Sequence, residues 1–416
     1  MMTGATLRAI TLIVRRSLRQ HAVSTLVTAA SVALAVGLLM AVFSINAQTY
    51  RAFTGGPVGF DAVLGARGSQ IQLVLNTVFH LETSPGNIPW SLYESIRRDP
   101  RVRLAIPYAV GDNFMGFRIV GTIGDLFSQF QFAPGGRAFD PAKNEAVIGQ
   151  VVAEKTGLRV GSVFSPFHGV NFDENMRHAD EFVVAGVLQT SHSPSDRVIW
   201  IPIDGVFHMT GHVLRGTGET YQPRPGEEIP AEHKEVSAVM LKLRNPQAGF
   251  MLDQSINRQG RVATLAWPIG LVMAELFDKM GWMYRILQMV AWLIVGVAGA
   301  TVFAGVYNTI QERRRDFAIL RALGARRRTV FSAVVIESAA ITALGAAASF
   351  LVYGALLAGA AAVIRAQTGV VLDALYFHPA LILGPIGAVA LGGAVGIVPA
   401  IKAYATDVAA HLAPVS

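Results

Sequence analysis

The chain has 416 residues, of which 52% are hydrophobic and 15% are charged, and this excess of apolar side chains indicates a membrane protein. Its formal net charge of +7 does not point to nucleic acid, because residues 47–280 hold 21 basic and 23 acidic residues whereas the remainder holds 14 and 5. The positive charge therefore flanks the apolar runs, as membrane topology requires. The absence of cysteine excludes a disulfide framework and thiolate chemistry.

Two predicted elements precede residue 47. Residues 22–46 are the first predicted transmembrane helix, because residues 20–50 contain no Asp, Glu, Lys or Arg and about 20 residues cross a bilayer. A cleaved signal peptide fits less well, since the apolar run is too long and no A-x-A site closes it. Residues 1–21 are expected to form an amphipathic helix on the inner leaflet, with a plain positive flank as the alternative. The apolar face of this helix would hold Leu7, Ile10, Val14 and Leu18.

Residues 47–280 form a polar segment of ordinary globular size. Short β-rich runs such as VRLAIPYAV, FRIVGTIG and RVIWIPI alternate with helical runs such as IPWSLYESIRRDP, which Pro100 ends. Arginines before the first span place the N-terminus in the cytoplasm. The segment is therefore predicted to be a large α+β extracytoplasmic domain that ends in a helical stalk.

The rest of the chain predicts three further spans. Transmembrane helices are expected at 281–311, 329–364 and 380–402, where charged residues are almost absent. A short outside loop at 365–379 and a cytoplasmic tail at 403–416 complete the layout. The fold class is thus an α-helical membrane protein with four transmembrane helices, one plus three, and the α+β domain between the first two. Both termini are expected in the cytoplasm.

The segment 312–328 is a charged band between two of these spans. It contains seven arginines and two acidic residues, so its charge places it in the cytoplasm. Phe317, Leu320 and Leu323 recur at three-residue spacing, and Gly324 follows where a helix would stop. This pattern predicts a short amphipathic helix that docks onto a cytoplasmic partner.

The run ERRRDFAILRALGARRRTVFSAVVIES resembles the hallmark segment of FtsX/MacB-type ABC transporter permeases. In that family the segment couples the permease to its nucleotide-binding protein. The resemblance therefore implies a coupling role for Glu312, Arg313, Arg314, Asp316, Phe317, Ile319, Leu320, Arg321, Leu323 and Gly324.

The outer domain carries a second part of the resemblance. EAVIGQVVAEKTGLRVGSVF, FVVAGVL and DRVIWIP are similar to the extracytoplasmic domain of MacB-like permeases, which implies an α/β part with a β-rich insertion at about 140–230. The one-plus-three layout also matches MacB-like and lipoprotein-releasing permeases.

The sequence contains no motif for catalysis. None of its six lysines follows a glycine, so a phosphate-binding P-loop is excluded. We therefore expect a non-catalytic chain without a cofactor of its own, with ATP and magnesium on a partner ATPase. Glu337 is the acidic residue inside the apolar runs. An intramembrane carboxylate indicates function by default, and pairing with an arginine is the favoured structural alternative.

Histidines concentrate in one part of the outer domain. Six of the ten fall within 168–233, among several carboxylates, and imidazole with carboxylate suits zinc. His192, His208 and His212 are the predicted ligands, since His208 and His212 stand four residues apart. Scattered surface histidines are the alternative, because the strong zinc-ligand spacings are missing.

These patterns together predict the permease subunit of an ABC transporter in the inner membrane. It would couple ATP hydrolysis on a separate cytoplasmic ATPase to movements of the outer domain that export or release a substrate. A lipoprotein-releasing permease, a mechanotransmitting regulator of an extracytoplasmic partner and a zinc-linked transport system are the alternatives. The expected partners are the ATPase, a second copy of the chain, a periplasmic or extracellular protein and membrane lipid, but not nucleic acid.

Overall fold

The computed structural model describes residues 4–55, 59–169, 172–210, 214, 216 and 228–404. The chain divides into two compact units. The helical unit comprises residues 1–48, 280–361 and 373–416, and the sheet unit comprises residues 49–279 and 362–372. The sheet unit therefore includes the end of the third long helix in addition to the predicted outer domain. Residues 405–416 of the predicted tail lie outside the described residues.

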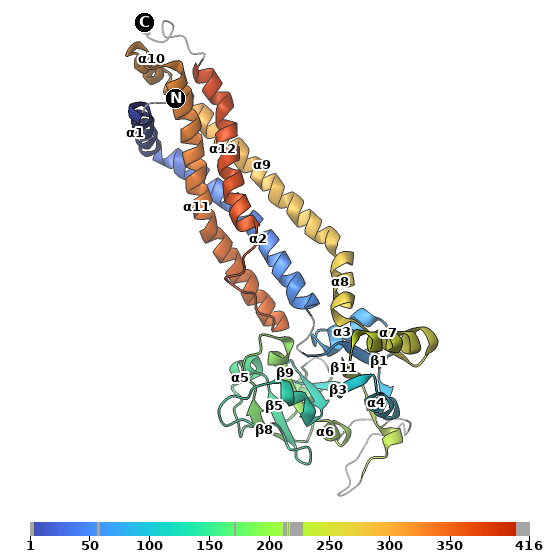
Figure 1. Ribbon diagram of the computed structural model, residues 1–416. Helices are drawn as coiled ribbons and strands as arrows, with labels where there is room; N and C mark the ends of the chain where they lie inside the picture. The colour runs from blue at the N-terminus through green and yellow to red at the C-terminus, as the bar shows by residue number, and fades with distance from the viewer. Residues whose placement is uncertain are drawn as a thin grey trace. The chain divides into compact units, whose positions relative to one another are not determined.

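Four helices dominate the helical unit, and they run alongside one another (Figure 1). Among the described residues, four helices are long and apolar enough to cross a membrane, in agreement with the predicted one-plus-three layout. They are α2 (Ala22–Thr54), α9 (Gly281–Glu312), α11 (Arg327–Thr368) and α12 (Ala380–Tyr404). Two short helices, α1 (Gly4–Gln20) and α10 (Arg314–Ala322), lie at the same end of this unit (Figure 1).

Small residues set the spacing of the long helices. A Cβ atom added at Gly345 of α11 would lie 2.6 Å from the carbonyl oxygen of Ala29 in α2. A Cβ atom added at Gly37 of α2 would lie 2.6 Å from Val352 Cβ in α11. Glycine at these positions lets the helices approach closely, which is how membrane helices associate without a hydrophobic driving force.

The short helix α1 uses its apolar face inside the helical unit. Ile10 and Val14 are buried against Ala333 of α11, whereas Leu12 on another face is exposed. Part of the predicted interfacial face therefore packs on protein, and α1 is held against the N-terminal end of α11.

The sheet unit is built around a mixed ten-stranded sheet in the order β12-β1-β11-β3-β4-β9-β5-β8-β6, with β7 paired to β3. The β4–β9 and β5–β8 pairs are parallel, and the other pairs are antiparallel. Its strands are β1 (Ala62–Ala66), β3 (Val102–Phe114), β4 (Phe117–Thr122), β5 (Glu145–Ile148), β6 (Val163–Phe164), β7 (Phe167–His168), β8 (Phe182–Val187), β9 (Val198–Pro202), β11 (Ala238–Leu243) and β12 (Ala263–Ala266). A separate two-stranded sheet pairs β2 (Ile88–Pro89) with β10 (Glu235–Val236).

Helices and short turns connect these strands. The helices are α3 (Gln70–Thr77), α4 (Trp90–Arg97), α5 (Gln150–Thr156), α6 (Ile203–Phe207), α7 (Pro246–Asp253) and α8 (Ile269–Lys279). The 3-10 helices are η1 (Gly124–Gln129), η2 (Glu174–Met176), η3 (Pro194–Arg197) and η4 (Ala231–His233), and η5 (Gln254–Gln259) is a π-helix. The strands and helices predicted from the sequence agree with these elements, so the predicted fold class is confirmed.

Two hydrophobic cores lie on opposite faces of the large sheet. Successive strand residues alternate between the cores: Leu64 belongs to one and Val63 to the other, because side chains along a strand point to opposite faces. Helices α4, α5, α6 and α7 contribute to the first core, and α3 and α8 contribute to the second. Both faces are therefore covered, which leaves functional side chains to the sheet edges and loops.

The end of α11 is part of the sheet unit. Val370 is buried in the second core, and Arg365 lies 3.7 Å from Glu154 of α5. The helix accordingly continues to Thr368, four residues beyond the predicted end of the third span at 364. The added residues find partners within the sheet unit, which the hydropathy pattern does not reveal.

Candidate coupling site and histidine cluster

Helix α10 connects two membrane helices through sharply defined ends. Arg313 ends α9 and precedes α10, and its amide donates to Thr309 O at 3.1 Å. At the other end Gly324 adopts φ +99, a conformation that glycine enters without a steric penalty. The helix at Arg314–Ala322 is thus shorter than the predicted 312–328, because Gly324 ends the helical turn and α11 starts only at Arg327.

A buried ion pair anchors the start of α10. The Arg313 guanidinium donates to Glu337 Oε2 at 3.3 Å and to Ser17 Oγ at 2.6 Å. The Ser17 hydroxyl also donates to Glu337 Oε1. All three side chains are buried, and they come from α1, the α9–α10 junction and α11. The intramembrane carboxylate of the sequence therefore lies opposite an arginine and completes a three-helix joint.

Phe317 adds to this joint from within α10. Its ring lies 5.1 Å from Arg313 Cζ, a cation–π arrangement, and its side chain is only 4% exposed. The ring packs inward, so the expectation that Phe317 shares an accessible docking face with Leu320 and Leu323 is not met. The ring of Phe317 packs against the buried guanidinium and does not face solvent.

The exposed surface of α10 is both charged and apolar. Leu323 is 80% exposed and Ile319 is 42% exposed, and these residues stand four apart on one helical face. Leu320 and Arg321 are half-buried, while Glu312, Asp316 and Gly324 are exposed. Glu312 also lies 3.4 Å from His21. The side chain of Arg314 lies outside what the structure describes. This surface offers apolar contact and charge.

The predicted histidine ligands are not brought together. His212 lies outside the described residues. His208 caps α6, and its Nδ1 donates to Asp204 O at 2.8 Å. His192 follows another path, with its backbone amide donating to Asp196 Oδ2 at 2.9 Å. Within the described part of the chain, neither His192 nor His208 belongs to a group of three potential metal ligands. The four-residue spacing required a continuing helix, and α6 ends at Phe207.

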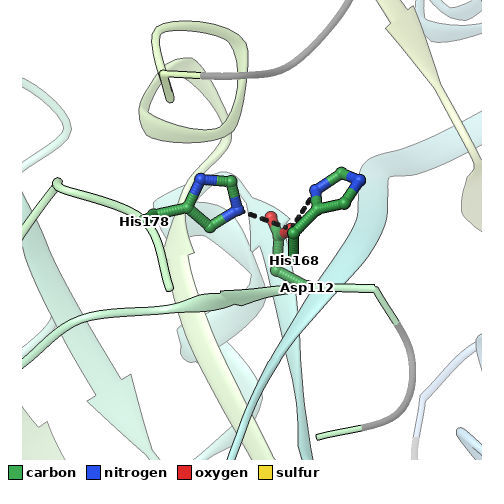
Figure 2. A group of neighbouring side chains, drawn as sticks. All are labelled: Asp112, His168 and His178. Carbon is green, nitrogen blue, oxygen red and sulfur yellow. Dashed lines mark hydrogen bonds and ion pairs between the residues drawn. The ribbon is translucent and has the colours of Figure 1, made fainter. Parts of the chain in front are cut away.

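A different trio of ligand-type side chains does converge. One ligand atom from each of Asp112, His168 and His178 lies within 4.8 Å of the other two. His178 Nε2 is 3.2 Å and His168 Nδ1 is 3.4 Å from the same carboxylate oxygen, Asp112 Oδ1. Figure 2 shows both imidazole rings directed at the Asp112 carboxylate.

The strand pairing explains this convergence. Asp112 and His168 are register partners in the antiparallel β3–β7 pair, and directly opposed residues have adjacent side chains. A bulge in β3 between Val110 and Asp112 redirects the strand locally, as bulges next to functional sites do. His178 follows η2, and its backbone amide donates to Pro166 O at 2.9 Å. Two short segments are thereby held beside β3.

Asn113 fixes β7 in this position. Its buried side chain donates to Gly169 O at 2.8 Å and Phe167 O at 3.5 Å, and it accepts from Gly116 N at 3.2 Å. A buried side-chain amide that satisfies several backbone groups rigidifies its surroundings. Asn113 therefore supports the Asp112–His168 register without pointing at the ligand trio itself.

Burial and charge act in opposite directions on His178. Burial lowers the pKa of the imidazole, but the hydrogen bond to Asp112 and its negative charge, together with the contact to Thr210, raise it more. The net result is a raised pKa. Asp112 and His178 are buried, whereas the His168 side chain is 46% exposed. The trio is thus closed on one side and accessible on the other.

Sequence reasoning found two of the three members only as part of a histidine-rich region. His168 and His178 belong to the stretch 168–233, but Asp112 is far upstream in a strand. The signal that joins them is the register of the two-residue strand β7, which local sequence does not encode.

Comparison with known proteins places both units. Residues 25–257, more than half of the chain, match the MacB-like periplasmic core domain, and residues 288–408 match the FtsX-like permease C-terminal family. The lipoprotein-releasing system transmembrane protein LolE of Haemophilus influenzae is 22% identical over 300 residues, which span 64% of this chain and 65% of that relative's length.

Two solved structures match about half of the chain. The periplasmic region of MacB from Actinobacillus actinomycetemcomitans matches with a TM-score of 0.34 at 10% identity, over 54% of this chain and 94% of that one. The extracellular domain of the noncanonic ABC-type transporter YknZ from Gram-positive bacteria matches with a TM-score of 0.29 at 13% identity, over 49% and 99%.

The family matches and the four apolar helices indicate the subcellular location of the chain. It is an inner-membrane protein with an extracytoplasmic domain, which is the sheet unit. The predicted resemblance is confirmed, since the charged segment that carried it lies inside the matched C-terminal region. The chain therefore belongs to the FtsX/MacB-type permease family, with a MacB-like periplasmic core domain and an FtsX-like permease C-terminal region.

Proposed function

We propose that this permease works with a separate cytoplasmic ATPase that docks on α10 and moves it during ATP hydrolysis. The observation that carries the proposal is the construction of α10, which presents Ile319 and Leu323 outward while Arg313 ties its base to α1 and α11. Topology alone would need the arginines but neither the exposed apolar pair nor the buried anchor. ATP and magnesium belong to the partner in this scheme.

The covalent path from α10 supports transmission to the sheet unit. Helix α11 is continuous from Arg327 to Thr368, and its last residues belong to the sheet unit. Helix α9 begins at Gly281, directly after α8 of that unit. A displacement at α10 would therefore enter two helices whose chains continue into the extracytoplasmic domain.

The output of this movement is export or release of a substrate at the outer face. We propose that two copies of the chain act together, with both termini in the cytoplasm and the sheet unit available to a periplasmic or extracellular partner. Regulation of such a partner without solute movement is the competing outcome. Cargo movement in sealed vesicles supports transport, whereas partner activation without cargo movement supports regulation.

Lipoprotein release is the second candidate, favoured by one observation. The curated relative is a transmembrane protein of a lipoprotein-releasing system, and the match covers 65% of its length. An acylated protein would then be the cargo. Release of a lipid-modified protein from proteoliposomes that contain the permease and its ATPase would support this candidate, and failure to release any acylated protein would oppose it.

The docking proposal is tested by removing the exposed apolar pair. Ile319→Ser with Leu323→Ser keeps every arginine, so insertion and orientation should survive. Each buried aliphatic side chain contributes roughly 1.5–3 kcal/mol to a contact. We therefore expect the variant to lose co-purification with its ATPase.

The matched control removes an exposed apolar pair from the sheet unit. Phe250→Ser with Met251→Ser changes two exposed side chains of α7 and should leave ATPase recruitment unchanged. A double variant in α10 that still recruits a fully active ATPase would make the segment a topology anchor and defeat the proposal.

A further inference from the structure

We propose that the extracytoplasmic sheet unit binds a zinc ion through Asp112, His168 and His178. This inference goes beyond the proposed permease function and does not depend on it. It is carried by the convergence of two imidazole nitrogens on one carboxylate oxygen, at 3.2 and 3.4 Å.

These separations suit a shared metal ion. Zinc binds imidazole nitrogen and carboxylate oxygen at about 2.0–2.2 Å with tetrahedral angles, which places neighbouring ligand atoms about 3.3 Å apart. The observed nitrogen-to-oxygen distances of 3.2 and 3.4 Å bracket that value. The donor set of two nitrogens and one oxygen also favours zinc over magnesium or calcium, which prefer oxygen ligands throughout.

The tautomer of His178 suits a metal ligand. Its Nδ1 lies 2.9 Å from the backbone carbonyl of Thr210, and because a carbonyl can only accept, Nδ1 carries a proton. Nε2 is the ring nitrogen that faces Asp112 Oδ1 at 3.2 Å, and it is the atom that would bind the ion.

The same contact is the orientation that metal-binding histidines use. A ligating imidazole commonly donates its other N–H to a backbone carbonyl or a carboxylate, which fixes the tautomer and the ring plane. Thr210 supplies that carbonyl, and its own amide donates to Asp180 Oδ2 at 3.0 Å. His178 is thus oriented in advance by a partner outside the trio.

The open side of the trio faces a cavity. His168 lines a cavity of about 200 Å³ whose other walls include Asn87, His233 and Glu235. An ion at the trio would therefore be reached through this cavity, on the side where the His168 side chain is 46% exposed.

The test is a zinc titration of the full-length chain in detergent after chelator treatment. We expect wild-type protein to bind one zinc ion per chain in calorimetry at neutral pH. His168→Ala should weaken binding by at least 100-fold, since loss of even an outer partner of a ligand costs about 10–100-fold. Zinc should also raise the melting temperature of the wild type but not of this variant.

Two further variants make the result decisive. His208→Ala removes a histidine of the same region that lies outside the trio and should bind zinc like the wild type. Asp112→Asn removes the central charge with little change of shape and should lose binding as His168→Ala does. Should the buried Asp112 variant fail to fold, the exposed His168 variant still decides the outcome. No wild-type binding at micromolar zinc, or equal binding by wild type and His168→Ala, would overturn the proposal.

Discussion

Two buried polar clusters, one in each unit, differ in their charges. In the helical unit, Arg313 meets Glu337 and Ser17, so a positive group faces a negative group. In the sheet unit, the carboxylate of Asp112 faces two imidazoles, whose charge depends on protons or on a metal. Each cluster joins side chains from three separate segments of the chain.

The two clusters therefore differ in how they respond to pH and to metal ions. The cluster of Arg313, Glu337 and Ser17 is called the fixed joint, and the trio of Asp112, His168 and His178 is called the responsive cluster. The guanidinium is charged at every accessible pH, so the positive side of the helical cluster does not change state. An imidazole changes state near neutrality and binds metals, so the cluster in the sheet unit has at least two states. The permease thus carries a rigid connection beside its proposed ATPase contact and a chemically sensitive site in its outer domain.

The largest effect is expected from breaking the fixed joint. Glu337→Ala leaves the Arg313 guanidinium buried without its carboxylate, which typically costs about 3–5 kcal/mol. The melting temperature of the detergent-purified chain should therefore fall sharply. The matched control Glu312→Ala removes an exposed acid that lies 3.4 Å from His21 and should change stability by less than about 1 kcal/mol.

A double variant then sharpens the interpretation. Arg313→Met with Glu337→Ala removes both charges, and we expect it to recover part of the lost stability, because the cost lies in the uncompensated charge. Equal stability of Glu337→Ala and the wild type in thermal unfolding would show that the joint is not a structural anchor.

The second effect concerns a buried histidine without a carboxylate partner in its environment. Burial, with the nearby charge of Arg118, lowers the pKa of His80 from 6.5 to about 3, the opposite direction from His178. Because the unfolded state binds the proton more readily, stability is lost as the pH falls below 6.5 toward 3. The loss attributable to His80 should reach roughly 2–3 kcal/mol near pH 4.5.

His80→Phe isolates this contribution. The variant should show a flatter dependence of stability on pH between 6.5 and 4.5 than the wild type, as measured by denaturant unfolding at a series of pH values. Parallel curves for the two proteins would mean that His80 does not remain neutral in the folded state, and the contrast with His178 would fail.

The smallest effect tests how the responsive cluster is positioned. Asn113→Ala removes side-chain bonds to Gly169 and Phe167 and leaves buried carbonyls unsatisfied, at a cost of about 1–3 kcal/mol. It should also weaken zinc binding about tenfold through the shifted β7, without touching a ligand. Unchanged zinc affinity in calorimetry would show that β7 is held by other contacts.

The membrane architecture could be predicted from the sequence because it depends on the composition of each long segment. Charge-free runs mark the four spans, and β-rich runs such as VRLAIPYAV and RVIWIPI mark strands β3 and β9 of the sheet unit. Gly324 was the predicted helix stop, and its left-handed backbone ends α10. These features depend on local backbone preferences or on the apolar composition of a single segment.

The candidate sites were harder to read because they depend on partners. Phe317 matches the apolar spacing of a docking face, but its ring packs against the buried Arg313 beside it. Asp112 joins His168 through strand register, whereas His208 lies outside the trio and bonds Asp204 of its own helix. Residue types and spacing identify candidate site residues, but tertiary contacts determine which of them lie together.

Cysteine crosslinking in native membranes tests the central claim most directly. The chain has no cysteine of its own, so Leu323→Cys on α10 and Met115→Cys on the sheet unit each provide a single handle on an exposed residue. We predict that Leu323→Cys crosslinks to the cytoplasmic ATPase and resists impermeant reagents applied from outside, whereas Met115→Cys labels from outside and gives no ATPase adduct. Labelling of Leu323→Cys from outside, or an ATPase adduct through Met115→Cys, would contradict the account.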